Sequence, residues 1–197
     1  MALLTWPSAI RPRSFSLVLM PNQRAHGSMF GGSQQVVDLL NDRWVASMSL
    51  PVRKHADAAA LESWIASFRG FVNTVGVWHR ARPAPLGTLR GSPVLEAAAA
   101  QGADEIVIDA TAGETLLAGD MLGLDGLLLQ VAENCTANGS GVITVPLVNR
   151  LRRAVADATA VVWDAPTAPM RLASAPVLVY QPGYADAVDL EFVEAIE

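Results

Sequence analysis

Hydrophobic and polar residues alternate along several short segments of the chain, which is the pattern of half-buried β-strands. The first alternating segment is Ser14–Met20, and a turn dipeptide of Pro and Asn follows it. Two further segments, Ser33–Leu40 and Arg43–Leu50, flank the dipeptide Asn41-Asp42. Because two alternating segments with a short polar connection are typical of a hairpin, we predict that these two segments pair with each other.

A helix is predicted over His55–Phe71, where four large apolar residues recur at helical spacing. Asp57 is a candidate cap for its first turn, and Gly70 is a candidate stop. An apolar stripe on one side of a helix predicts a sheet for the helix to pack on, and we expect the following strand, Phe71–Trp78, to join that sheet. The stripe consists of Leu61, Trp64, Ile65 and Phe68.

The composition changes at residues 79–88, where two prolines and a glycine indicate a boundary. Beyond it the chain is aliphatic and rich in turn residues, and Asp125-Gly126 between two apolar runs predicts a hairpin. Val94–Ala100, which follows a Ser-Pro dipeptide, is either a short helix or a linker. The strands predicted for this second module lie in Glu105–Asp109, Leu122–Val131, Gly141–Val148 and Ala158–Trp163.

A second pair of prolines precedes three final apolar runs, of which Val188–Ile196 alternates most regularly. We expect these runs to return to the first sheet. The whole pattern predicts a mainly β fold, with a β-sandwich-like module and one packed helix in residues 1–86 and 169–197, and an inserted small β-barrel-like module in residues 87–168. The other two final runs are Met170–Ser174 and Val177–Tyr180.

Composition narrows the classes of partner. Of the 197 residues, 51% are hydrophobic and 17% are charged, so a core forms easily, and we expect some apolar surface to be buried between subunits. The net charge of −5 and the lack of a basic cluster predict no nucleic-acid partner. The basic residues are thirteen Arg and the single Lys54, a bias that a GC-rich genome explains as well as a preference for Arg at desolvated interfaces does.

The sequence contains no recognisable motif of a catalytic or metal site. Its only cysteine, Cys135, excludes an intrachain disulfide and a Cys-rich metal site. The histidines His26, His55 and His79 are far apart and lack metal-ligand spacing. The Gly-Gly-Ser segment at residues 31–33 is the nearest approach to a nucleophile elbow, but it precedes a strand. We therefore predict that the chain is not an enzyme and uses no cofactor, metal or catalytic residue.

The N-terminal segment has no signal-peptide pattern, because its arginines follow the apolar residues instead of preceding them. No apolar run approaches the roughly 18 residues of a membrane span, so we expect none. Prolines predict an extended arm over Met1–Pro12, which we expect to lie across a neighbouring subunit. Interfaces are enriched in Arg and aromatic residues, and the alternative is core tryptophans with a solvated rim of arginines. The predicted subunit interface consists of Trp6, Arg11, Arg13, Phe30, Arg43 and Trp44.

Four segments of the first module are distinctive, namely Arg13–Phe15, Phe30–Gln35, Asn41–Trp44 and the helical Ala58–Phe71. In this combination they resemble the distal tail and tail-hub proteins of long-tailed bacteriophages. The second module, with Leu116–Asp120 followed by residues 126–131, is similar to a β-rich insertion found in some phage tail proteins. The resemblance covers most of the chain.

The resemblance implies a structural virion protein of the tail tip or baseplate hub, made in the host cytoplasm and assembled into the phage tail. It also implies a homo-oligomeric ring, often a hexamer, that joins the tail tube to tip, hub or fibre proteins. The β-sandwich module would form the ring and the insertion would project outward. Because the chain is shorter than many such proteins, we do not expect the large carbohydrate-binding additions of some of them.

Three alternatives stay open at this point. One is a carbohydrate-binding or adhesion module that uses exposed tryptophans such as Trp44 and Trp78. Another is a different β-rich virion protein, such as a tail terminator or a capsid decoration protein. The third is a hydrolase that uses scattered carboxylates, although the sequence has no motif for it.

Overall fold

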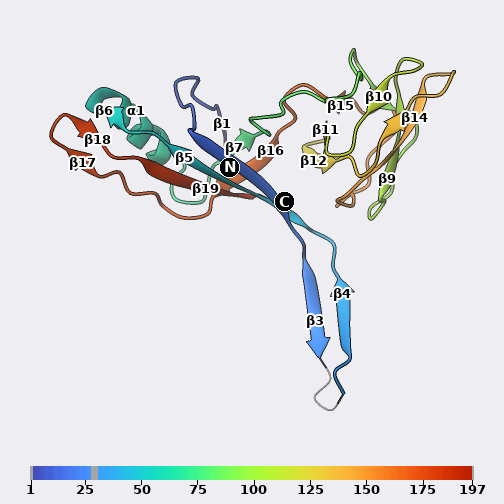
Figure 1. The fold of residues 1–197 in the computed structure, drawn as a ribbon, viewed down its shortest axis with the longest axis horizontal. Coiled ribbons are helices and arrows are strands. Elements are labelled where there is room, and N and C mark those ends of the chain that lie inside the picture. Colours follow the sequence, from blue (N-terminus) through green and yellow to red (C-terminus); the bar gives the residue numbers. More distant parts are fainter. Residues whose placement is uncertain (1, 28–30, 197) are drawn as a thin grey trace. The chain divides into compact units, whose positions relative to one another are not determined.

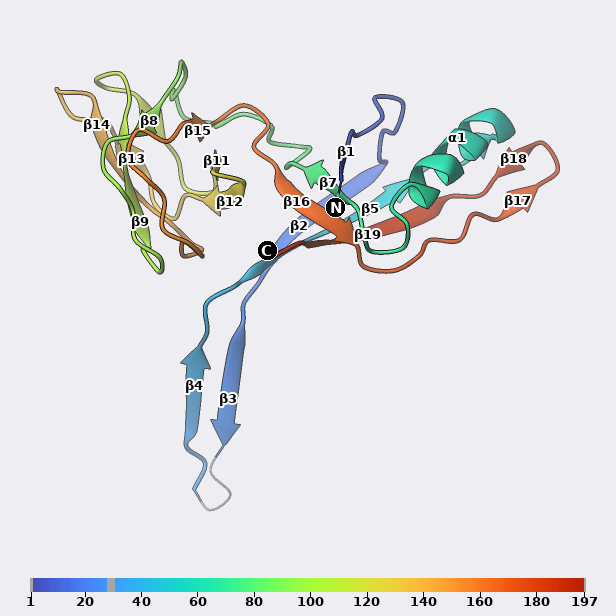
Figure 2. The ribbon, with the colours of Figure 1, turned by 180° about the vertical axis from the view of Figure 1, so that it is seen from behind.

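Figures 1 and 2 show the computed structural model, which describes residues 2–27 and 31–196. The chain is mainly β, with 42% of its residues in strands and 6% in one helix, which confirms the expected mainly β class with one helix. Its internal contacts divide it into two compact units. Unit 1 consists of Met1–Val18, Trp44–Ala81 and Thr167–Glu197, and unit 2 consists of Leu19–Arg43 and Arg82–Pro166.

Unit 1 is built on a six-stranded sheet with the strand order β1-β7-β16-β19-β5-β2. β1 runs parallel to β7, whereas the pairs β7–β16, β16–β19 and β19–β5 are antiparallel. Because β16 and β19 come from the final part of the chain, the predicted return to the first sheet is confirmed for them. The strands are β1 Leu3–Leu4, β2 Ser14–Met20, β5 Arg43–Leu50, β7 Thr74–Val77, β16 Ala168–Leu172 and β19 Val188–Glu194.

The large sheet has one covered and one open face because its side chains alternate. In β5, Trp44 and Met48 are 3% and 2% exposed, whereas Ser47 between them is only partly covered. On the covered face, Phe192 of β19 meets Phe68 with ring centroids 6.1 Å apart. Phe68 follows the helix directly, so the aromatic contact holds the helical segment on the buried face of the sheet.

The helix α1 spans His55–Ala66 and ends before the predicted Phe71. Its N-cap residue is Lys54, without a side-chain capping bond, so the prediction that Asp57 caps the helix is wrong. Asp57 lies inside the first turn, where its negative charge interacts favourably with the helix dipole. The chain then turns as far as Gly70, whose φ of +72° favours glycine. Of the predicted stripe, Leu61 and Phe68 are buried, and Trp64 and Ile65 are half-buried.

A second, three-stranded sheet in unit 1 has the order β17-β18-β6. It lies beside the start of the helix, where the Nε2 atom of His55 is 2.9 Å from the carbonyl oxygen of Gln181 and hydrogen-bonded to it. Of the predicted run Val177–Tyr180, only Tyr180 lies in a strand. The strands are β6 Arg53–Lys54, β17 Tyr180–Gln181 and β18 Tyr184–Ala185.

The predicted hairpin around Asn41-Asp42 is wrong. β4 (Gln34–Asp38) pairs antiparallel with β3 (Gln23–Gly27), and β5 pairs instead with β19. Adjacent residues of a strand point to opposite faces, so Val36 and Val37 give β4 no apolar face, whereas β5 buries one face completely. The dipeptide therefore connects the exposed strand β4 to the core strand β5 without closing a hairpin between them.

The strands of unit 2 form three small sheets besides the pair β3–β4. Within the described part of the chain these sheets do not close into a barrel, which corrects the barrel-like expectation. The predicted hairpin at Asp125-Gly126 is confirmed, since β11 pairs with β12 and the turn residues have positive φ angles of 48° and 76°. The predicted helix or linker Val94–Ala100 contains a strand, β8. The sheets are β10 Thr115–Leu116 with β13 Cys135–Thr136; β12 Leu127–Gln130, β11 Met121–Leu124 and β15 Val161–Val162; and β14 Val142–Pro146, β9 Glu105–Asp109 and β8 Val94–Leu95.

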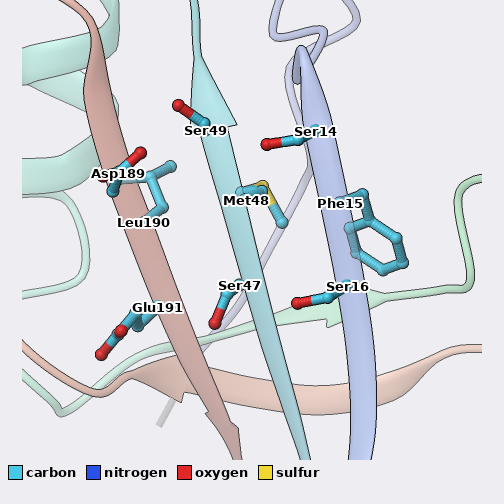
Figure 3. A pocket seen from close by; sticks show the side chains of 9 residues that line it. All are labelled: Ser14, Phe15, Ser16, Ser47, Met48, Ser49, Asp189, Leu190 and Glu191. Atoms are coloured by element: carbon cyan, nitrogen blue, oxygen red, sulfur yellow. The ribbon is translucent and has the colours of Figure 1, made fainter.

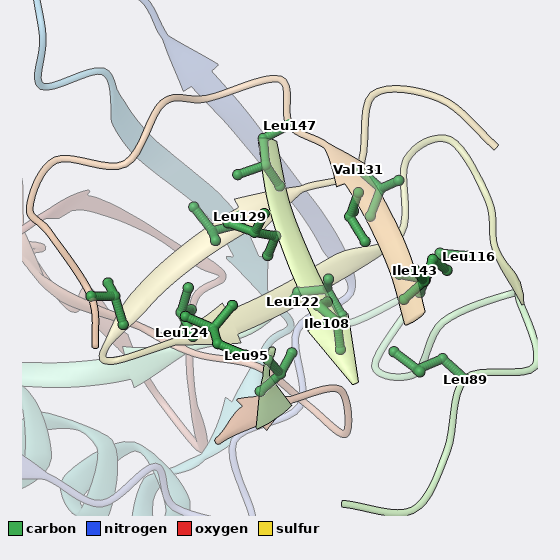
Figure 4. Close-up of a cluster of buried hydrophobic side chains, with 14 of the residues drawn as sticks. Leu89, Leu95, Ile108, Leu116, Leu122, Leu124, Leu129, Val131, Ile143 and Leu147 are labelled. Atoms are coloured by element: carbon green, nitrogen blue, oxygen red, sulfur yellow. The ribbon is translucent and has the colours of Figure 1, made fainter. Parts of the chain in front are cut away.

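A cluster of buried aliphatic side chains, drawn from the strands and connections of residues 89–161, fills the interior of unit 2 (Figure 4). Beside it lies a buried carboxylate, Asp120, which is 3% exposed. Its two oxygens accept hydrogen bonds from the backbone N–H groups of Leu86, Gly87 and Leu117 at 2.8, 3.1 and 2.8 Å. Because a buried carboxylate is tolerated only when it is hydrogen-bonded, this side chain joins the entry segment of unit 2 to its central turn.

Candidate functional site: surfaces for assembly

The strand β2 lies at one end of the large sheet, and no described strand pairs with its outer edge. Its sequence, Ser-Phe-Ser-Leu-Val-Leu-Met, contains no charged residue and no proline. Two of its hydrophobic side chains, Val18 and Met20, are 52% and 53% exposed. Edge strands are normally protected by charges, prolines, bulges or a covering segment. The edge of β2 therefore offers free backbone groups and apolar side chains to another strand.

A shallow groove of about 270 Å³ crosses the open face of the same sheet over β2, β5 and β19 (Figure 3). Its polar lining consists of small hydroxyl side chains on β2 and β5 and of two carboxylates on β19. Asp189 is paired with Ser49, and Glu191 is paired with Ser47, in the register of the sheet. Both carboxylates are exposed, and neither forms an ion pair with a described residue. We call this surface the acidic groove; its serines are Ser14, Ser16, Ser47 and Ser49.

Every residue of the strands β3 and β4 is exposed. Cross-strand pairing places Arg24 opposite Val37 and His26 opposite Gln35, so these four side chains share one face of the hairpin. Asp38, on the other face, forms an ion pair with Arg150 at 3.2 Å. A two-stranded hairpin has little stability of its own in water, so this segment is suited to binding a partner surface.

The predicted interface residues lie in different environments. Arg11, Arg13 and Arg43 are exposed, as an interface requires. Trp44 is 3% exposed, and its backbone N–H donates to the buried carboxylate of Glu194 at 3.0 Å. Trp44 therefore belongs to the core of its own unit, which corrects its assignment to an interface. Phe30 lies outside the described residues.

The N-terminal arm packs on its own unit. β1 pairs with β7 of the same chain, and the half-buried Trp6 contacts three aromatic rings with centroid separations of 5.1 to 6.3 Å. This placement corrects the expectation that the arm lies across a neighbouring subunit. The physical reason is that the chain's own aromatic cluster already covers much of the Trp6 ring. The three rings belong to Trp64, Trp78 and Phe192.

Arg80, which is outside the predicted interface set, contacts the aromatic cluster around Trp6. Its guanidinium carbon lies 4.1 Å from the ring centroid of Trp6 and 3.6 Å from that of Trp78. Its Nε and Nη2 atoms are buried and have no hydrogen-bond partner among the described residues. Burial lowers the pKa of Arg80 to about 10, so the group stays charged at neutral pH. The spacing of Trp78 and Arg80, which puts both side chains on one side of an extended segment, could have indicated this contact.

The described part of the chain, residues 2–27 and 31–196, was also compared with the requirements of a metal site and of a membrane span. No group of three or more His, Cys, Asp or Glu side chains there is arranged to hold a metal ion. No helix there combines the length and the apolar character that crossing a membrane requires.

A scan against models of known protein families found no match to this chain. A search among curated proteins also found no match.

Proposed function

We propose that the chain is a structural virion protein that forms a homo-oligomeric ring at the distal end of a phage tail. In this role it would join the tail tube to tip or fibre proteins. The supporting observation is the open, uncharged edge of β2 on a six-stranded sheet. Subunits of a ring meet through two different surfaces that close by rotation, and an unprotected edge needs a neighbour to cover it.

Two further features are consistent with a protein that assembles. The hairpin β3–β4 is exposed along its whole described length and is not stabilised by a core of its own. The arginines Arg11, Arg13 and Arg43 are exposed, and Arg is a favoured residue at interfaces because its guanidinium is planar and weakly hydrated.

The tryptophans give no support to a carbohydrate-binding module. A sugar platform needs an accessible aromatic face, but Trp44 is 3% exposed. Trp78 is half-buried, and both Trp6 and Arg80 lie against its ring. A glycan array screened with the wild-type chain tests this alternative independently of assembly.

Electron microscopy of the negatively stained, purified full chain tests the proposal. We expect closed rings of uniform diameter, because a heterologous contact that closes by rotation produces one size of particle. Open fibres or isolated subunits at all concentrations would contradict a ring.

A further inference from the structure

We propose that the hairpin β3–β4 of one copy binds the acidic groove on the large sheet of a second copy. This inference rests on the proposed function, since it assumes that the chain associates with itself. Beyond a ring, it identifies the hairpin of a second copy as the partner of the groove. The contact residues are Arg24 and His26 on the hairpin and Asp189 and Glu191 in the groove.

The groove has the properties of a surface that accepts a polar strand. Its two carboxylates are exposed, and they have no ion-pair partner among the described residues. The serines beside them are short, so a backbone can approach the sheet closely. Their hydroxyl groups can donate to or accept from an incoming peptide. Arg171 of β16 also lies on this face, opposite Val193, but it forms no ion pair with either carboxylate. Two exposed carboxylates without an ion pair favour a partner with positive charge and N–H donors.

The hairpin presents those groups on one face. Arg24 supplies a permanent positive charge, and the ring of His26 supplies an N–H donor whichever of its nitrogens carries the proton. Apart from the backbone pairing of β3 with β4, neither side chain forms an ion pair or a hydrogen bond with a described residue. The carboxylate of Asp38 lies on the opposite face and is already paired with Arg150, so it does not reduce the positive charge of the binding face.

The spacing of the two sets matches. Arg24 and His26 are two residues apart on β3, and Asp189 and Glu191 are two residues apart on β19. In any strand, residues two apart point to one face and are separated by about 6.6 Å, twice the rise per residue. A hairpin that lies along β19 therefore places both of its donors opposite both carboxylates at once. This agreement in charge and spacing is the reason for choosing a second copy of the chain as the occupant.

Sedimentation equilibrium of the wild-type chain and four variants tests the proposal. We expect Arg24→Glu and Glu191→Arg each to weaken self-association about tenfold or more, because each puts like charges opposite one another. The double variant with both changes restores the opposite charges, so we expect it to associate within about threefold of the wild type. Glu105→Arg is the control, since Glu105 is an exposed strand residue outside the groove, and we expect no change.

The outcomes separate this inference from the proposed function. If the wild type associates and neither single change weakens its self-association, the proposed hairpin contact is wrong, whereas the proposed ring is not contradicted. If both single changes weaken association but the double variant does not recover, the direct contact is overturned as well. A wild type that is monomeric at every concentration overturns both proposals. Circular dichroism confirms folding of each variant, and all substituted side chains are exposed.

Discussion

The guanidinium carbon of Arg80 lies 3.6 Å from the ring centroid of Trp78. The same group is 4.1 Å from the ring centroid of Trp6 in the N-terminal arm. A charged guanidinium near two aromatic rings is held by cation–π attraction of about 0.5–2 kcal/mol per ring. The arm is therefore part of unit 1, and its removal is expected to destabilise that unit instead of acting on assembly alone.

Replacing Trp6 tests this role of the arm. We expect Trp6→Ala to lower the free energy of unfolding by about 2–3 kcal/mol, less than the loss for a fully buried tryptophan because the ring is half-buried. Urea denaturation, monitored by circular dichroism, measures this change in the free energy of unfolding. Arg69→Ala is the control at an exposed residue, where we expect a change within about 0.5 kcal/mol. Equal effects of the two changes would show that the arm contributes no packing.

Asp120 provides a test of the core of unit 2. Asp120→Ala leaves three backbone N–H groups without their acceptor, so we expect a loss of about 3 kcal/mol or more in the free energy of unfolding. Asp120→Asn keeps one oxygen acceptor and should lose about half as much. Thermal denaturation compares both with Asp109→Ala, which removes an exposed carboxylate. A loss for Asp120→Ala no larger than that of the control would refute the bridging role.

Cys135 offers a prediction about pH. Burial, reinforced by the negative charge of Asp120, raises the pKa of the Cys135 thiol above its ordinary value, while a backbone hydrogen bond involving Leu116 lowers it in part. The folded chain then contains less thiolate at pH 8 than the unfolded chain does, and the thiolate is the reactive form. We expect iodoacetamide to alkylate the folded chain more slowly than the chain in guanidinium chloride, with the folded rate still rising above pH 9. Equal rates at pH 8 would contradict the shift.

The open edge of β2 is tested by adding a charge to it. Val18→Lys puts an ammonium group on the edge strand, where an incoming strand would have to desolvate it, so we expect weaker self-association. Val162→Lys makes the same change at a side chain of similar exposure, 48% against 52%, in unit 2. Size-exclusion chromatography at several concentrations compares the two. A shift toward smaller species in both variants alike would assign the effect to general surface charge.

The sequence predicts elements well where local pattern and burial agree. Ser14–Met20 and Glu105–Asp109 are strands with the predicted bounds, and Asp125-Gly126 forms the predicted turn because its residues tolerate positive φ. The prediction of a hairpin around Asn41-Asp42 was wrong because the turn pattern does not reveal which strand has a buried face. Pairing between residues as distant as Ser47 and Glu191 leaves no local trace in the sequence.

The candidate site was less predictable than the elements. Composition indicated arginines and aromatic residues, but it could not separate the exposed Arg43 from the buried Trp44 beside it. Once β5 is placed in a sheet, adjacent side chains point to opposite faces, and this alternation leaves Arg43 exposed and Trp44 buried. The acidic groove requires the register of β5 and β19, which only the folded chain provides.

Native mass spectrometry of the purified chain, repeated across a range of concentrations, tests whether the chain assembles into a closed ring. We predict one discrete closed oligomer, a hexamer, with no ladder of larger species, because a ring closes when the last subunit joins. A chain that stays monomeric at every concentration would contradict the claim that the edge of β2 is covered by a second copy.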